Sequence, residues 1–205
     1  MDIIQPNYLC YILGITTMWC SLPNILALYF DNINYSIDYV IIFFQVCIII
    51  SSNLHWCYHS PNSIYAWTDT IIVILFVIIG LFKLFFYSEP IFKFIGLLLL
   101  FICSIFFKYS CIIRYTANKD YGMLLHVLFR FTVFWFIIIL MCPNVINYVN
   151  FLFLSLIYFI HIYLVRNYFI YKQFNIEDEI IKGNLIVLLL SVISAIFIIT
   201  NIEGI

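Results

Sequence analysis

Residues 64–82 read IYAWTDTIIVILFVIIGLF, a stretch in which Asp69 is the single charged residue. About 20 mainly apolar residues in a helix are enough to cross the roughly 30 Å of hydrocarbon in a bilayer. On a water-soluble protein, the same stretch would expose apolar surface on every side of the helix. It therefore predicts a membrane-spanning helix, and the carboxylate of Asp69 near its beginning needs a polar partner.

The rest of the chain has the same character. Of its 205 residues, 66% are hydrophobic and 9% are charged, and the mean hydropathy is +1.12, whereas roughly half of the residues in soluble domains are apolar. This composition predicts a single polytopic membrane domain over residues 1–205, with membrane lipids as its partners. The net charge is −1 and the sequence has no basic stripe, which argues against nucleic acid as a partner.

Seven apolar runs are long enough to cross a membrane, so we expect an all-α fold, a seven-transmembrane-helix bundle. Pro23 lies inside the first run and predicts a kink there rather than an end. The polar stretch from Arg166 to Asn184, with its Glu177-Asp178-Glu179 run, is expected to be a solvated loop. The runs cover approximately residues 8–30, 37–58, 64–82, 90–108, 122–142, 147–166 and 183–201.

Lys and Arg in the short loops predict the orientation, because cytosolic loops carry an excess of both. With seven spans, the N-terminus and the even-numbered loops share one side of the membrane. That side has six basic residues and the other has two, Lys83 and Lys93 at the edges of the third loop. We therefore expect the N-terminus in the cytosol and the C-terminus on the opposite side. The six residues are Lys108, Arg114, Lys119, Arg166, Lys172 and Lys182.

All four histidines lie near span ends that this count places on the cytosolic side. His55 and His59 end the second span, His126 lies one turn into the fifth, and His161 lies in the last turns of the sixth. Asp69, early in the third span, is on the same side. The five residues stay together even if the absolute orientation is reversed, because their grouping depends only on the number of spans.

This grouping predicts a zinc site. Imidazole is the commonest protein ligand of zinc, and a catalytic zinc typically has three protein ligands and one open position. His55, His126 and a third histidine, either His161 or His59, would supply the ligands. Ser51, His55 and His59 follow one another at i, i+4 spacing, which puts them on or near one helix face.

Two further residues suggest the chemistry of such a site. The hairpin between the second and third spans can bring Asp69 beside His55, where it would hold a zinc-bound water, act as a general base or orient a ligand histidine. Ser51 could donate a hydrogen bond to the developing oxyanion of a lipid carbonyl.

A purely structural interpretation explains the same residues differently. Histidine, tryptophan and tyrosine collect at membrane interfaces because their rings are amphipathic, so the four histidines could form an interfacial belt. Asp69 and Arg130, which both lie inside spans, would then form an ion pair. A channel or transporter is a third option, but charged residues along the spans are too few to outline a pathway.

The motifs around His55 resemble those of the CREST superfamily, which includes alkaline ceramidases, the PAQR (adiponectin-type) receptors and the myomaker branch. The matching residues are Ser51-Ser52-Asn53-Leu54-His55, Asp69 in Ala66-Trp67-Thr68-Asp69, and His55-Trp56-Cys57, which is similar to the His-x-Cys of the myomaker branch. The resemblance implies a zinc-dependent hydrolase of lipid amides or esters. In it, His55 would bind the metal, with Ser51 and Asp69 around the metal-bound water.

The last span departs from that family pattern. The family has His-x-x-x-His in its seventh span, whereas the run from Leu185 to Thr200 contains no histidine. Two hypotheses therefore stand. The first is a zinc-dependent lipid hydrolase with His55, His126 and His161 as ligands and His59 as the alternative third. The second is a non-enzymatic seven-span protein, such as a receptor-like, fusion or assembly factor.

Overall fold

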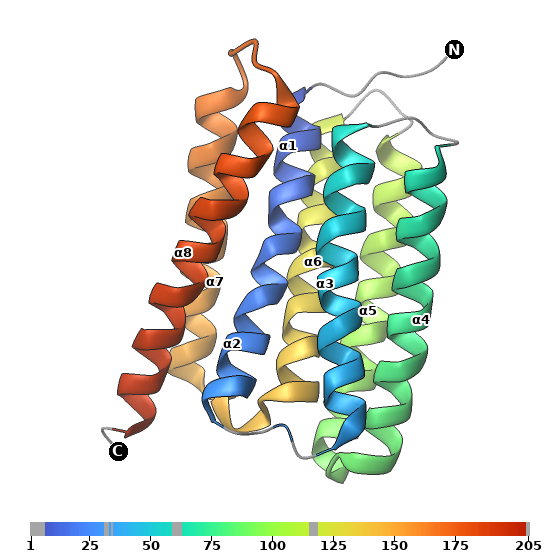
Figure 1. The fold of residues 1–205 in the computed structure, drawn as a ribbon, viewed down its shortest axis with the longest axis vertical. Coiled ribbons are helices and arrows are strands. Elements are labelled where there is room, and N and C mark those ends of the chain that lie inside the picture. Colours follow the sequence, from blue (N-terminus) through green and yellow to red (C-terminus); the bar gives the residue numbers. More distant parts are fainter. Residues whose placement is uncertain (1–6, 31–32, 34, 59–62, 115–118, 204–205) are drawn as a thin grey trace.

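The computed structural model describes residues 7–30, 33, 35–58, 63–114 and 119–203, and this part of the chain is helical, with no strand. Seven helical segments in it are long and apolar enough to cross a membrane. They stand side by side with their axes roughly aligned (Figure 1). The elements are α1 (Asn7–Ile15), η1 (Thr16–Cys20), α2 (Ser21–Tyr29), α3 (Ser36–Cys57), α4 (Ile64–Tyr87), α5 (Pro90–Arg114), α6 (Lys119–Met141), η2 (Pro143–Val145), α7 (Tyr148–Phe169) and α8 (Ile176–Glu203).

The number and positions of the long helices agree with the seven apolar runs, but three of their ends do not. α5 continues to Arg114, so Lys108 lies inside a helix and not in the fourth loop. α4 continues to Tyr87, so Lys83 lies inside a helix and not at a loop edge. α8 begins at Ile176, so the expectation of a solvated loop up to Asn184 was wrong. Glu177, Asp178 and Glu179 form its first turn, where the unpaired backbone N–H groups and the helix dipole favour negative charge.

The first span is a continuous segment of three pieces. α1 ends at Ile15, a 3-10 helix covers Thr16–Cys20, and α2 begins at Ser21. Pro23 explains the change, because proline has no N–H to give to the carbonyl four residues earlier and its ring crowds that carbonyl. In the structure Pro23 falls in the first turn of α2, where an N–H has no partner in the helix anyway. The first run continues past Pro23 as expected, whereas the kink itself stays a prediction.

This first segment forms the centre of the bundle. Most of Tyr8–Tyr29 is buried, and so is most of α6, whereas the other five long helices expose much of their apolar surface. α3, α6, α7 and α8 all pack against α1, η1 or α2, α5 packs closely along α6, and α4 packs along α3. Figure 1 shows α1 and α2 between the α7–α8 pair and the group formed by α3, α4, α5 and α6.

Small residues allow α8 to approach α1 closely. A Cβ atom at Gly183 of α8 would collide with the hydroxyl of Tyr11, and one at Gly14 of α1 would collide with the side chain of Ile180. Between helices in a bilayer, where lipid tails compete with side chains, close van der Waals packing of this kind is a main source of association. The two glycines therefore fix where the last helix docks on the first.

Candidate functional site

The predicted site residues lie toward one end of the bundle. α3 and α7 finish there, whereas α1, α4, α6 and α8 begin there, at the top of Figure 1. We refer to this as the histidine end. Ser51 is six residues before the end of α3 and Asp69 is five residues after the beginning of α4. At about 1.5 Å per residue, both lie roughly 8–9 Å inside the helical bundle.

The structure brings Ser51 and Asp69 together. The Ser51 hydroxyl donates to Asp69 Oδ1 over 2.8 Å, and it also lies 3.3 Å from the carbonyl oxygen of Ile48 in its own helix. The side chain of Ser51 is buried. The α3–α4 hairpin thus gives Asp69 a partner one helical turn before His55.

Arg130 of α6 binds the next serine along the chain. Its guanidinium Nη2 donates to Ser52 Oγ over 2.6 Å, and both residues are buried. Arg130 is also close enough for its positive charge to act on the carboxylate of Asp69. Two adjacent serines of α3 therefore connect an acid on α4 to a base on α6. We call Ser51, Ser52, Asp69 and Arg130 the serine-linked cluster.

His55 and His126 both contact the ring of Trp56. The ring centroid of Trp56 is 4.7 Å from that of His55 and 5.6 Å from that of His126. His126 is 4% exposed, and its Nδ1 lies 3.4 Å from the hydroxyl oxygen of Ser110 on α5. His126 is therefore a buried residue of the helix core, whereas His55 is partly exposed at the end of α3.

His161 lies in a different part of the bundle. It is buried on α7, with its ring 6.1 Å from that of Trp19 in the 3-10 segment. Its Nδ1 has no hydrogen-bond partner among the described residues. Because α7 continues to Phe169, His161 is about two turns inside the helix, deeper than its expected position in the last turns.

The described residues do not fit a three-ligand zinc site. No group of three His, Cys, Asp or Glu side chains that could hold a metal ion occurs among them. His59, the alternative third ligand, lies outside the described residues. Zinc binding therefore stays a prediction, with no geometry from this structure to support it.

Two contacts at the histidine end were not anticipated from the sequence. Asn184 Nδ2 of α8 donates to Asn53 Oδ1 of α3 over 3.0 Å, which joins the last helix to the hairpin of the serine-linked cluster. The second contact is between Tyr58, at the C-cap of α3, and Glu177 of α8, whose negative charge raises the pKa of Tyr58. The sequence does contain a hint of the asparagine pair, because Asn53 and Asn184 each lie inside an apolar run.

The opposite end of the bundle holds a buried ion pair. Lys83 Nζ lies 2.5 Å from Asp38 Oδ1, and both side chains are almost completely buried. Asp38 Oδ2 also accepts a hydrogen bond from the backbone N–H of Tyr35 at the beginning of α3 (3.1 Å). The sequence did not predict this pair because Lys83 was assigned to the edge of a loop. Without Lys83, the side of the membrane with the larger number of basic residues is unchanged, and so is the expected orientation.

No family model matches this chain, and neither a curated protein nor a solved structure matches it. The functional assignment therefore depends on the residues and contacts described above.

Proposed function

We propose that this chain is an integral, multi-pass membrane protein without a catalytic centre, a receptor-like, fusion or assembly factor. In this proposal its seven long helices cross the bilayer, with the N-terminus in the cytosol and the C-terminus on the opposite side. The serine-linked cluster then has a structural role, and the histidines belong to the core and the membrane interface.

One observation carries this proposal: the two adjacent serines of α3 bind Asp69 of α4 and Arg130 of α6 (2.8 and 2.6 Å). A charged side chain in hydrocarbon is costly unless it has a partner, so residues of this kind inside spans need pairing. Here each charge has a hydroxyl, and the opposite charge is nearby. The polar groups of the cluster therefore bind one another and join α3, α4 and α6.

The test compares two variants of the cluster. Asp69→Asn and Arg130→Gln should both lower the thermal stability of the detergent-purified protein, because each leaves the other charge buried with fewer partners. Thr70→Val is the matched control, since the Thr70 hydroxyl is exposed and bonds to Ala66 of its own helix (2.8 Å). Wild-type stability in both cluster variants would contradict the proposal, and so would about one zinc per chain that His55→Ala removes.

A zinc-dependent hydrolase of lipid amide or ester bonds at the cytosolic leaflet is the second candidate. The hydrogen bond between Ser51 and Asp69 favours it, because the CREST resemblance implies these two residues side by side, one turn from His55. Asp69 would accept a proton from water, and Ser51 would donate to the oxyanion. The ligand set would need a third histidine beside His55 and His126, and His59 is the residue to test.

The same protein preparation separates the two candidates. Elemental analysis gives the zinc content of the wild type and of His55→Ala and His59→Ala. Proteoliposomes that contain ceramide or phosphatidylcholine then report release of fatty acid. A hydrolase loses this activity in Ser51→Ala at unchanged zinc content and nearly unchanged stability. A structural cluster gives no activity in any variant.

A further inference from the structure

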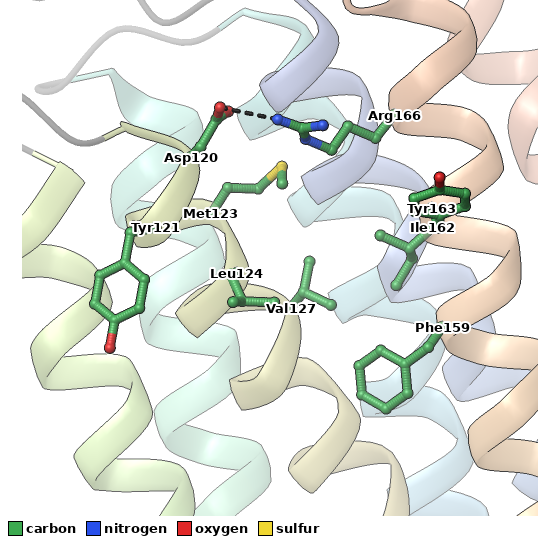
Figure 2. A pocket seen from close by; sticks show the side chains of 9 residues that line it. All are labelled: Asp120, Tyr121, Met123, Leu124, Val127, Phe159, Ile162, Tyr163 and Arg166. Atoms are coloured by element: carbon green, nitrogen blue, oxygen red, sulfur yellow. Dashed lines mark hydrogen bonds and ion pairs between the residues drawn. The ribbon is translucent and has the colours of Figure 1, made fainter.

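A cleft of about 380 Å³ lies between α6 and α7 at the histidine end. α7 packs on α1 rather than along α6, so the two helices diverge there. No residue of the serine-linked cluster and none of the described histidines lines the cleft. Figure 2 shows α6 and α7 side chains on its two sides. The lining residues are Asp120, Tyr121, Met123, Leu124, Val127, Phe159, Ile162, Tyr163 and Arg166.

Aromatic rings close the cleft toward the middle of the bundle. The ring of Phe159, which lines the cleft, lies 5.0 Å from that of Phe131 on α6. Further along, Trp135 and Phe151 are also 5.0 Å apart. α6 and α7 are therefore in contact on the side of the cleft toward the middle of the bundle and apart toward the histidine end. The cleft is closed by aromatic rings at its inner end and has apolar walls.

The rim of the cleft is charged. Arg166 Nη2 lies 3.0 Å from Asp120 Oδ2, and Asp120 Oδ1 accepts a hydrogen bond from the Tyr8 hydroxyl (2.7 Å). Figure 2 shows this ion pair above the apolar side chains of Leu124, Ile162 and Phe159. A polar rim over apolar walls matches the shape of an amphiphile, with a charged head and a hydrocarbon tail.

The rim favours an anionic head. A guanidinium has five N–H donors, and Arg166 uses one nitrogen for Asp120, so the group can also bind phosphate oxygens with its fork geometry. Both oxygens of Asp120 already accept from donors of the protein, which reduces its repulsion of a second anion. Basic groups at the cytosolic surface of a membrane attract anionic lipids.

The walls favour a hydrocarbon tail. In a bilayer no water is available to fill an apolar gap between helices, and an empty gap forfeits van der Waals contacts. Leu124 and Tyr163 line the cleft and are also exposed at its outer side, where lipid tails would reach them. The volume of the cleft lies at the lower end of the range for ligand pockets, about 300–1,000 Å³, which suits one chain better than a whole two-chain lipid.

We propose that this cleft holds one acyl chain of an anionic phospholipid from the bilayer, with the phosphate bound by Arg166. The inference rests on the proposed placement of the helices in a membrane, and it adds a lipid site that the serine-linked cluster does not require. The lipid would complete the packing between α6 and α7 where their side chains do not meet.

The experiment measures phospholipid bound to the full chain. Protein purified in mild detergent is analysed by native mass spectrometry, with and without added phosphatidylglycerol or phosphatidylcholine. Leu124→Trp fills the cleft, and Leu97→Trp on α5 is its control, because Leu97 is similarly exposed and does not line the cleft. Arg166→Gln removes the head contact, and Lys172→Gln is the control for charge.

Wild-type protein should retain about one phosphatidylglycerol per chain and bind it more tightly than phosphatidylcholine. Leu124→Trp should lose both lipids. Arg166→Gln should weaken phosphatidylglycerol alone by about tenfold, a free-energy difference of about 1.4 kcal/mol. Equal retention in Leu124→Trp and Leu97→Trp would overturn the proposal, as would a free fatty acid in place of the phospholipid. Extraction of the protein from membranes by alkaline carbonate would instead refute the membrane placement itself.

Discussion

Charged side chains lie at both ends of α3, but they are compensated in different ways at the two ends. At its beginning, Asp38 pairs directly with Lys83 of α4 (2.5 Å). Near its end, Ser51 and Ser52 stand between Asp69 of α4 and Arg130 of α6. The direct pair neutralises two charges with one contact and joins two helices. The serine-linked cluster uses two neutral hydroxyls and joins three helices.

This difference teaches how each end should respond to mutation. In the direct pair, each buried charge has one partner of opposite charge, so the loss of that partner leaves a buried charge that is not neutralised. In the serine-linked cluster, each charge has a hydroxyl and a nearby opposite charge, so a single change removes only part of the compensation. The first end should therefore be the more sensitive.

Lys83→Met breaks the direct pair and should have the largest effect. It leaves Asp38 buried without its cation, and loss of one partner of a buried ion pair costs about 3–5 kcal/mol. Reversible unfolding in mixed micelles measures the change in the free energy of unfolding. The double variant Asp38→Asn with Lys83→Met should recover much of the loss. A double variant as unstable as Lys83→Met would show that the ion pair is not the cause.

Ser52→Ala breaks the serine-linked cluster at its arginine side and should have a smaller effect. Arg130 loses the hydroxyl that accepts its hydrogen bond, and a hydrogen bond from a charged donor contributes about 1.5–3 kcal/mol. The same unfolding experiment measures it. Ser104→Ala on α5 is the matched control, because the exposed Ser104 hydroxyl bonds only to Leu100 of its own helix (2.8 Å). A loss larger than that of Lys83→Met would reverse the ranking of the two ends.

Asn184→Ala measures how much an interhelical hydrogen bond between uncharged side chains contributes to stability at the histidine end. The Asn184–Asn53 hydrogen bond joins α8 to α3 without any charge, and such interhelical bonds average about 0.6 kcal/mol, with a maximum near 1.7. Asn201→Ala is the control on the same helix, because Asn201 Nδ2 bonds to Phe197 of its own helix (2.9 Å). A change as large as that of Ser52→Ala would mean that charge adds little to the cluster.

Hydropathy was enough to predict the number and approximate positions of the helices, because it depends on local composition alone. The meeting of Asp69 with the end of α3 also followed from the sequence, since a short hairpin leaves few alternatives. The partner of Asp69 in the structure, however, is Ser51, one turn away from the expected neighbour His55. The spacing of Ser51 and His55 shows that they lie on the same face of α3. It does not show which of the two lies level with Asp69 of α4.

The placement of His161 could not be predicted, for a physical reason. In a soluble helix, polar residues mark the side that faces water, but a helix in lipid is apolar on its buried and exposed sides alike. The sequence of α7 therefore does not show its rotation about its own axis. The structure turns His161 toward Trp19 of the first segment. Lys83 was missed because its helix continues one turn beyond the uncharged run.

The central position of the first segment has a consequence for biosynthesis. Tyr8–Tyr29 is the most buried of the seven and the least hydrophobic, with a mean hydropathy of 1.4 against 2.7 for Ile176–Ile202. Of the seven segments the ribosome makes this one before the others, yet α8, which covers part of it, is the last of the seven. At about 5–20 residues per second, roughly 7–30 s pass between the two. α3, α6 and α7, which also pack on the first segment, are complete before α8. By the end of that interval only the face of the first segment that α8 later covers lacks its final neighbour.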